Sequence, residues 1–260
     1  MTGSSGQPVG TPEVENHGRK VRSMFGRIAR PYDFLNRFFS LGVDVYWRWV
    51  LVRGVTGALR QAGRRVEESL ILDLATGSGD VARILSQQGL RVLGSDFCLP
   101  MLALAEKKGV ENLVAGDALN LPLVDEAVDG ATLAFGLRNF GDRAAGLREL
   151  RRVLKSGGSL HVLEFTRPVE CLCGIYFFYL KHVMPGLAGW FCRDPEAYVY
   201  LANTVEAFPR VEEIGRQMEE AGFTEVRWKR LSFGLVAIHT GRRRDGVGGE
   251  ERAGSSGEGA

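Results

Sequence analysis

The stretch "LILDLATGSGDVARIL", residues 70–85, changes its hydrophobic pattern half-way along. It begins with a nearly unbroken apolar run, which is typical of a strand buried on both faces of a parallel sheet. It ends with apolar side chains at helical spacing, and Asp80 lies in the expected first turn of that helix. Between them, Gly77 and Gly79 allow a tight turn and a close approach of the backbone to a ligand. The stretch therefore predicts a strand, a ligand-binding turn and a helix.

The same alternation continues along the chain. Short apolar runs at 91–96, 112–116, 128–135 and 158–165 alternate with helical patterns at 79–88, 99–108 and 142–154. Strands that alternate with helices indicate an α/β fold, in which a parallel sheet is covered by crossover helices. A helical pattern at 211–223 is then followed by two strands, at 224–231 and 234–241. This ending predicts antiparallel pairing at one edge of the sheet.

The chain divides into one domain and two tails. We expect disordered tails at 1–19 and 242–260, because both ends are polar or rich in glycine and charge. The domain between them, 20–241, begins with an amphipathic and aromatic segment at 20–65, which predicts a helical cap. An apolar and aromatic segment at 168–208 predicts a helical insertion. We expect no signal peptide, since the first residues contain no apolar core.

The composition argues against several classes of protein. The chain has 260 residues with 33 basic and 31 acidic side chains, and its net charge of +2 does not favour a nucleic-acid binder. The 4 histidines and 4 cysteines lack the spacing of metal ligands, so we expect no metal site. We interpret the cysteines as free thiols in a reducing compartment, which indicates the cytoplasm.

The turn at Gly77 and Gly79 has two candidate ligands. With Ala82 it matches the loose fingerprint of dinucleotide-binding proteins, which favours an NAD-dependent oxidoreductase. Asp80 opposes that interpretation, because a carboxylate in the first helical turn occupies the electropositive end that a pyrophosphate needs. S-adenosylmethionine (SAM) has no phosphate and is cationic, so Asp80 and the nearby Asp73 favour it. The alternative is that these carboxylates only cap a loop and a helix.

Acidic residues also end the next two strands. Asp96 ends the second strand, where a carboxylate accepts hydrogen bonds from the ribose hydroxyls of an adenosine. Asp117 and Ala118 follow the third strand, where we expect an adenine; a turn-forming aspartate is the alternative. These positions predict a nucleoside ligand without distinguishing SAM from NAD.

The fourth strand runs into "FGLRNF", residues 135–140, which places a charge and an amide at its carboxyl end. Ligands of α/β sheets bind at this edge, so we expect Arg138 and Asn139 to face a substrate; a solvated loop is the alternative. Glu164 ends the fifth strand, where it either anchors a loop or pairs with Arg138.

The motifs resemble, in this order, those of class I SAM-dependent methyltransferases, and more narrowly those of the ubiquinone/menaquinone biosynthesis C-methyltransferases. The resemblance extends from about Val21 to Gly241. It rests on "DLATGSGD" (73–80), "SDF" (95–97), "GDALNLP" (116–122) and "FGLRNF", with "YDFLNRFFSLGVDVYWRW" (32–49) before them and "HVMPGLAGW" (182–190) and "AYVYLANTVEAFP" (197–209) after them.

This resemblance implies the Rossmann-like, seven-stranded and mostly parallel sheet of these enzymes. It also implies C-methylation, by SAM, of a prenylated quinol such as demethylmenaquinol or a ubiquinone precursor. The SAM contacts of the family correspond to Ser78, Asp96, Asp117 and Ala118 of this sequence. At Ala134 the family usually has a serine, so we expect only a backbone contact there.

The reaction itself requires further groups. A quinol carbon becomes nucleophilic when a hydroxyl loses its proton, so the site needs an anion stabiliser and a proton acceptor. We expect Arg138 to stabilise the anion and Asn139 to orient the same oxygen or a water molecule. Tyr32 is expected to bind the substrate hydroxyl and Asp33 to accept the proton. For Tyr32, a place in the core is the alternative.

A prenylated quinol resides in a membrane, yet the apolar segment 173–191 is too interrupted by Lys181, His182 and Pro185 to span one. We expect a cytoplasmic enzyme that touches the inner face of the cell membrane through this segment and 36–52; a lid over a core helix is the alternative. A homodimer is compatible with the sequence but not required by it. Two other functions stay open: an NAD-dependent oxidoreductase and a non-catalytic SAM-binding scaffold.

Overall fold

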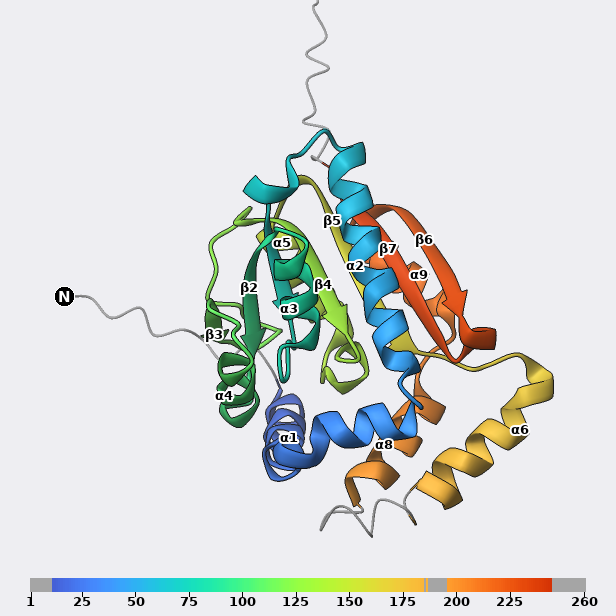
Figure 1. Cartoon of the computed structure of the whole chain (residues 1–260). Helices are drawn as coiled ribbons and strands as arrows, with labels where there is room; N and C mark the ends of the chain where they lie inside the picture. Colours follow the sequence, from blue (N-terminus) through green and yellow to red (C-terminus); the bar gives the residue numbers. More distant parts are fainter. Residues whose placement is uncertain (1–10, 185, 187–195, 245–260) are drawn as a thin grey trace, which may run out of the picture.

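A computed structural model describes residues 11–184, 186 and 196–244, and only the backbone of 30–32, 35 and 196–198. Its centre is a seven-stranded sheet in the order β3-β2-β1-β4-β5-β7-β6, with helices on both faces (Figure 1). The strands are β1 (Leu70–Leu74), β2 (Arg91–Asp96), β3 (Leu113–Ala115), β4 (Val128–Ala134), β5 (Leu154–Phe165), β6 (Phe223–Leu231) and β7 (Val236–Arg243).

The sheet is parallel from β3 to β5, and β7 runs antiparallel between β5 and β6. The expected sheet, mostly parallel with antiparallel pairing at one edge, is confirmed. Strand β1 pairs with β2 on one side and with β4 on the other, so the connections leave it in opposite directions. Such a reversal opens a crevice at the carboxyl ends of the strands.

Two apolar cores lie on opposite faces of the sheet. Successive residues of a strand point to opposite faces, and accordingly Ile71 belongs to one core and Leu72 to the other. The first core contains buried residues of α2 (Val43–Gln61), α3 (Asp80–Gln87) and α4 (Leu99–Lys107). The second contains buried residues of α5 (Arg143–Val153) and α9 (Val211–Glu220).

Strands β1 and β2 coincide with the predicted runs, and the helical patterns match α3, α4 and α5 to within a residue or two at each end. Among the strands, the largest difference is at β5, which begins at Leu154 rather than at 158. Val128 pairs with Leu154 and Gly130 with Ser159, so the register shifts between them. The glycines at 157 and 158 form this irregularity, which hides the early start of the strand in the sequence.

The expected C-terminal tail, 242–260, was placed too early, because β7 continues to Arg243. Arg242 and Arg243 belong to β7, where they pair with β5 and β6. The Arg243 guanidinium donates to the carbonyls of Arg151, Arg152 and Leu154, which lie where α5 ends. These carbonyls have no partner within their own helix, so the arginine caps it rather than extending into solvent. The rest of the expected tail, 245–260, lies outside the described residues.

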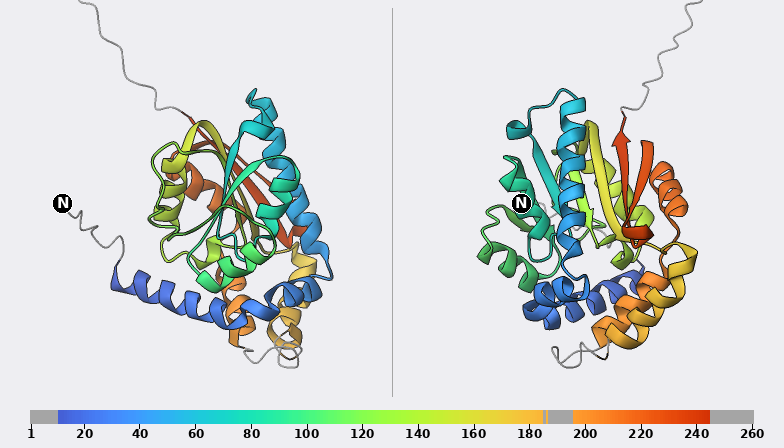
Figure 2. Two further views of the ribbon diagram at one scale, coloured as in Figure 1. Left: turned by 60° about the vertical axis from the view of Figure 1, so that its left-hand side comes forward. Right: turned by 45° about the vertical axis from the view of Figure 1, so that its right-hand side comes forward.

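The expected N-terminal tail, 1–19, was extended too far, because α1 already begins at Pro12. Helix α1 (Pro12–Phe39) begins with proline in its first turn and acidic residues at Glu13 and Glu15. All three favour a helix start, so residues 12–19 belong to the cap and not to a tail. Helix α1 crosses the end of the sheet at which the parallel strands terminate (Figures 1 and 2).

The apolar insertion lies beside α1. It contains α6 (Glu170–Phe178), the π-helical turn η3 (Tyr179–Val183) and α8 (Glu196–Ala207). Met24 and Ile28 of α1 share a small core with Leu180 of η3 and Val205 of α8. Among the described residues, no helix has both the length and the hydropathy that crossing a bilayer requires.

Candidate active site

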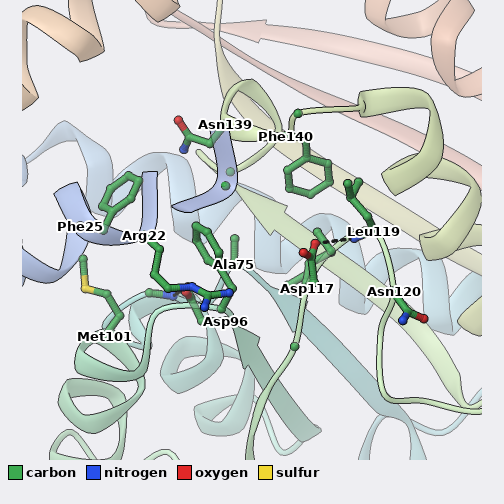
Figure 3. A pocket seen from close by; sticks show the side chains of 18 of the residues that line it. Arg22, Phe25, Ala75, Asp96, Met101, Asp117, Leu119, Asn120, Asn139 and Phe140 are labelled. Atoms are coloured by element: carbon green, nitrogen blue, oxygen red, sulfur yellow. Dashed lines mark hydrogen bonds between the residues drawn. The ribbon is translucent and has the colours of Figure 1, made fainter. Parts of the chain in front are cut away.

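A cavity of about 490 Å³ lies where α1 crosses the carboxyl ends of the parallel strands (Figure 3). This volume lies within the usual range for small-molecule sites. The lining includes Arg22 and Phe25 of α1, Gly77 after β1, Asp96 at the end of β2, Asp117 and Ala118 after β3, and Ala134 and Asn139 at and after the end of β4. The predicted residues of four strand ends therefore meet at one cavity.

A second, narrow cavity of about 30 Å³ shares Gly77 and Ala134 with the first and extends toward the glycine turn. It is lined by Asp73, Ser78, Asp80 and Arg48, among others. Together, the two cavities have a wide part over β2 and β3 and a narrow part over β1.

The two glycines of the turn have different functions. A Cβ atom at Gly77 would meet no protein atom within 4 Å, and Gly77 lines both cavities, so its missing side chain leaves room for a ligand. A Cβ atom at Gly79 would lie 2.7 Å from Val110 and 2.9 Å from the Cβ of Ala105. Gly79 therefore allows the start of α3 to pack against the end of α4, which is a structural requirement.

Asp96 lies buried on the floor of the wide cavity. Its two carboxylate oxygens accept hydrogen bonds of 2.8 Å from the backbone N–H groups of Gly77 and Cys98. Burial nevertheless raises the pKa of Asp96 above its ordinary value, against these hydrogen bonds. Each oxygen keeps a lone pair, so the carboxylate can still accept two hydroxyl groups from a ligand.

Asp73 is fully buried at the narrow cavity. It accepts hydrogen bonds of 2.6 Å from the hydroxyls of Thr76 and Thr132. Burial raises its pKa to about 6, although these hydrogen bonds and a backbone N–H oppose the shift. A cation in the narrow cavity would favour the charged form, which fits the predicted role beside a cationic ligand.

A network of charges joins α1 to the glycine turn. Lys108 Nζ lies 2.5 Å from Asp33, 2.8 Å from Asp80 and 3.0 Å from Ser78 Oγ. Ser78 also donates its hydroxyl to Asp33. Burial alone would raise the pKa of Asp80, but the hydrogen bond from Lys108 and the nearby arginines, Arg48 among them, lower it. Asp33 thus lies over the glycine turn rather than beside Arg138.

Three other residues that the sequence assigned to the cofactor line the wide cavity. Asp117 accepts a hydrogen bond of 2.9 Å from the Leu119 N–H, so it forms the turn expected as its alternative, and it also lines the cavity. Ala118 and Ala134 line the same cavity as half-buried residues. Ala134 closes β4, and the following Phe135 has a left-handed backbone with φ 57°. That conformation is unfavourable for phenylalanine and often marks functional sites.

The side chain of Arg138 is buried and already paired. Its Nη1 atom lies 2.7 Å from Glu164 Oε1 and donates to the Phe135 carbonyl at 2.6 Å. Its guanidinium stacks 5.4 Å above the ring of Phe165. The pairing left open by the sequence therefore exists. Arg138 lines neither cavity, and its Nε–H is a buried donor without a partner in the described structure.

Asn139, in contrast, faces the wide cavity (Figure 3). The hydroxyl of Tyr200, on α8, donates to its side-chain oxygen at 3.2 Å, and His17 bonds its backbone carbonyl at 3.1 Å. Since Tyr200 holds the amide oxygen, the amide N–H₂ group remains available as a donor. The side chain of Tyr32 lies outside the described residues, so its expected role stays a prediction.

Sequence reasoning missed the part of the site built by the N-terminal half of α1. Val14, Gly18 and Arg22 line the cavity, and Figure 3 shows Arg22 beside Asp96. Arg22 also stacks on Phe97 at 5.3 Å. A helix-start signal at Thr11–Pro12–Glu13 was present in the sequence. It stood in a polar segment with a glycine, which resembled a tail.

Comparison with known proteins identifies the family. The model of the ubiE/COQ5 methyltransferase family matches residues 13–243. The chain belongs to this family. It is 42% identical to the demethylmenaquinone methyltransferase of Corynebacterium kroppenstedtii, in a match that covers 87% of this chain and 96% of the relative. It is 46% identical, over 85% of its length, to the whole of the corresponding protein of Thermus thermophilus.

A solved structure supports the fold. A SAM-dependent methyltransferase of Thermotoga maritima, a possible histamine N-methyltransferase, superposes with a TM-score of 0.57 at 21% identity, over 85% of this chain and 99% of its own. The expected class I methyltransferase fold is confirmed. The family also decides between the two candidate ligands: the protein is a SAM-dependent methyltransferase and not an NAD-dependent oxidoreductase.

The residues that line the two cavities match the chemical groups of SAM. The wide cavity offers the buried Asp96 for ribose hydroxyls and the loop of Asp117 and Ala118 for an adenine. The narrow cavity offers Asp73 and the open side of Gly77 for the cationic methionine part. The basic residues nearest the start of α3, namely Arg37, Arg48 and Lys108, already lie within ion-pair distance of Asp80.

Proposed function

We propose that the protein is a demethylmenaquinone methyltransferase, which C-methylates the ring of a prenylated quinol. The identity of 42% and 46% to two enzymes of that name, over nearly their whole length, carries the proposal. Bound SAM supplies an electrophilic methyl group on its sulfonium. The chain must therefore bind the quinol next to the cavity, favour loss of a hydroxyl proton and exclude water.

Asn139 is the residue that we place at the substrate. Asn139 lines the cavity and Tyr200 donates to its amide oxygen, so the N–H₂ group is left to donate to the quinol oxygen that becomes negative. A donor held in place before the reaction stabilises that charge without reorganising. Tyr200 is then a positioning residue that acts through Asn139.

Arg138 stabilises the same anion through its charge. Its Nη1 group is held by Glu164 and the Phe135 carbonyl, which leaves the Nε–H as the donor without a partner. Because the guanidinium remains protonated, it serves as an anion stabiliser and not as a base.

Tyr32 and Asp33 keep roles at the α1 side of the site. Tyr32 binds a substrate hydroxyl. Asp33 was expected to accept the proton, but its carboxylate is engaged by Lys108 and Ser78. We therefore assign it to holding α1 over the glycine turn rather than to proton transfer.

The cell biology follows from the substrate. We propose that the enzyme works in the cytoplasm and reaches its quinol by peripheral contact with the inner face of the cell membrane. Cys98, Cys171 and Cys173 are free thiols, which accords with a reducing compartment. A homodimer remains compatible with this role. Nucleic acid is not expected as a partner.

An assay with methyl-labelled SAM and demethylmenaquinol tests the proposal. We expect label in menaquinol, identified by its mass. Binding of SAM without label in any quinol would favour the non-catalytic scaffold instead. A benzoquinol precursor of ubiquinone, assayed in parallel, tests which ring is preferred.

A further inference from the structure

Two exposed apolar side chains stand on unfavourable backbone. Leu41 is 88% exposed with φ 52°, and Phe233 is 76% exposed with φ 56°. Leu41 follows the end of α1, where glycine is the usual residue, and Phe233 lies in the short turn η4 (Ser232–Gly234). The sequence places a glycine directly after each of them, yet not at the position itself.

This combination is costly for the isolated molecule. A left-handed backbone disfavours leucine and phenylalanine relative to glycine, and neither side chain gains burial from its position. Strain held at a defined position points to a function there. No contact within the folded chain compensates for the strain at Leu41 and Phe233 among the described residues, so we expect their exposed side chains to contact something outside the chain.

The two positions belong to one surface. Trp47 of α2 donates to Ser232 of η4 at 2.8 Å, and the Val169 N–H, before α6, donates to the Phe233 carbonyl at 3.0 Å. Tyr179 donates to the Phe39 carbonyl at 3.2 Å, which joins the end of α6 to the end of α1. Figure 1 shows the end of α1, the start of α2 and α6 at the same end of the molecule.

Other exposed apolar side chains surround these two. We define the docking face as Leu41, Tyr46, Trp49, Ile175, Phe178 and Phe233, which are between 45% and 88% exposed. Tyr46 and Trp49 stack on each other, with ring centroids 6.5 Å apart. Tyrosine and tryptophan are the residues that favour the interface between lipid and water.

Basic residues accompany the docking face. Arg53 lies 4.7 Å above the ring of Trp49. Lys229 and Arg227 lie on the same face of β6 as Leu231, which packs in the core of α2. Arg53, Arg227 and Lys229 are exposed, and none of these three basic residues has an ion-pair partner among the residues that the structure describes. An apolar face with unpaired cations beside it is complementary to a bilayer with anionic headgroups.

We propose that the docking face seats the enzyme on an anionic phospholipid bilayer, with Leu41 and Phe233 inserted among the acyl chains. The inference rests on the proposed function, because a prenylated quinol resides in such a bilayer. It names the surface through which that substrate is reached. Trp47, Phe135 and Phe165 form an aromatic cluster between η4 and Arg138, so the docking face adjoins the apolar side of the active site.

Flotation with vesicles of phosphatidylcholine and phosphatidylglycerol, without quinone, tests the proposal on the full chain. The test variant is Leu41→Gly with Phe233→Gly, since glycine relieves the backbone strain. We expect its melting temperature to be unchanged or higher, whereas vesicle binding falls by roughly tenfold or more. Val124→Ser is the matched control: Val124 is 77% exposed but lies near Asp125, which pairs with Arg152 at the end of α5.

The outcomes separate the possibilities. Binding by the wild type and the control, weakened by salt and lost in the double variant, supports the docking face. Absence of wild-type binding, or equal binding by the double variant, overturns it. A wild-type dimer that the double variant converts to a monomer, seen by light scattering, would also overturn it by making the face an interface between copies. Methylation of a short-chain, soluble quinol is measured separately, so a failed proposed function leaves the vesicle result intact.

Discussion

At the scale of single residues, burial decides what the charged groups of the site can do. Arg138 is held by Glu164, and both side chains are almost fully buried. A buried ion pair contributes little net stability, but loss of one partner strands the other charge. The pair therefore fixes the position of the guanidinium relative to Asn139 and the cavity, which suits an anion stabiliser.

Replacing Arg138 by lysine tests that role. The lysine keeps the charge opposite Glu164 but loses the planar fork and the Nε donor. We expect kcat to fall by about 100-fold, as for loss of a single anion-stabilising donor, while the Kd for SAM changes only a few-fold. Initial rates and calorimetry measure the two quantities. A large loss of SAM affinity would instead place Arg138 in the cofactor site.

Asp96 is expected to behave in the opposite way. The substitution Asp96→Asn keeps the size of the side chain but removes the charge and one acceptor, so SAM binding should weaken by roughly tenfold or more. Calorimetric titration with SAM measures the change. Asp117→Asn, at the exposed mouth of the cavity, serves as a comparison with a smaller expected effect. Unchanged affinity in Asp96→Asn would remove this carboxylate from the cofactor contacts.

Asp73 predicts a pH dependence of cofactor binding. Its pKa is raised to about 6 by burial, so the ligand-free protein holds a proton there below that pH. A cationic ligand favours the ionised form, so its binding releases the proton and competes with it. SAM affinity should therefore rise as the pH increases through about 6 and then level off. Titrations between pH 5 and 8 measure it, and Asp73→Asn should lose the inflection; a flat wild-type profile would contradict the assignment.

At the scale of elements, the site is completed by a helix that crosses the sheet. Helix α1 lines the wide cavity near its start and meets the glycine turn at Asp33. Lys108, at the end of α4, bridges Asp33 and Asp80 and so joins three elements. We therefore infer that a half-buried charge network holds α1 over the glycine turn.

Lys108→Met should loosen α1. Without the ammonium group, Asp33 and Asp80 repel each other across the glycine turn. We expect faster hydrogen exchange in α1 and a several-fold weaker affinity for SAM, with little change in the exchange of β1 and β4. Lys107→Met is the control, because Lys107 is exposed and has no ion pair among the described residues. Equal exchange in the two variants would show that the network does not hold α1.

Prediction of the elements succeeded where one local rule dominated. Strands β1 and β2 are uninterrupted runs between turn residues, and their limits agree with the sequence. It failed at Pro12 and Arg243, where polar residues belong to a helix and a strand. These segments are held in regular structure by distant partners: α1 packs on η3 and α8, and Arg243 binds the end of α5. A local pattern contains no information about such contacts.

At the scale of the whole molecule, the wide cavity lies between elements that pack on different cores. The wide cavity is enclosed by α1, the sheet and the loops before α4, so a bound ligand joins them. SAM at 100 times its Kd should add about 2.7 kcal/mol to the free energy of unfolding. We expect a rise in melting temperature of roughly 5–10 °C with SAM and none with NADH, measured by thermal scanning. A shift with NADH instead would contradict the assigned cofactor.

The sequence alone determined the type of sheet, the glycine turn and the acidic residues at the ends of β1, β2 and β3. These features follow from the periodicity of apolar residues and from conformations that only certain residues adopt, and both are local properties. It also placed Arg138 and Asn139 at the end of β4. Only the tertiary structure decided that Arg138 pairs with Glu164, that Asp33 binds Lys108 and Ser78, and that α1 closes the cavity. Each of these depends on residues far apart in the chain, whose distance is set by packing and not by spacing.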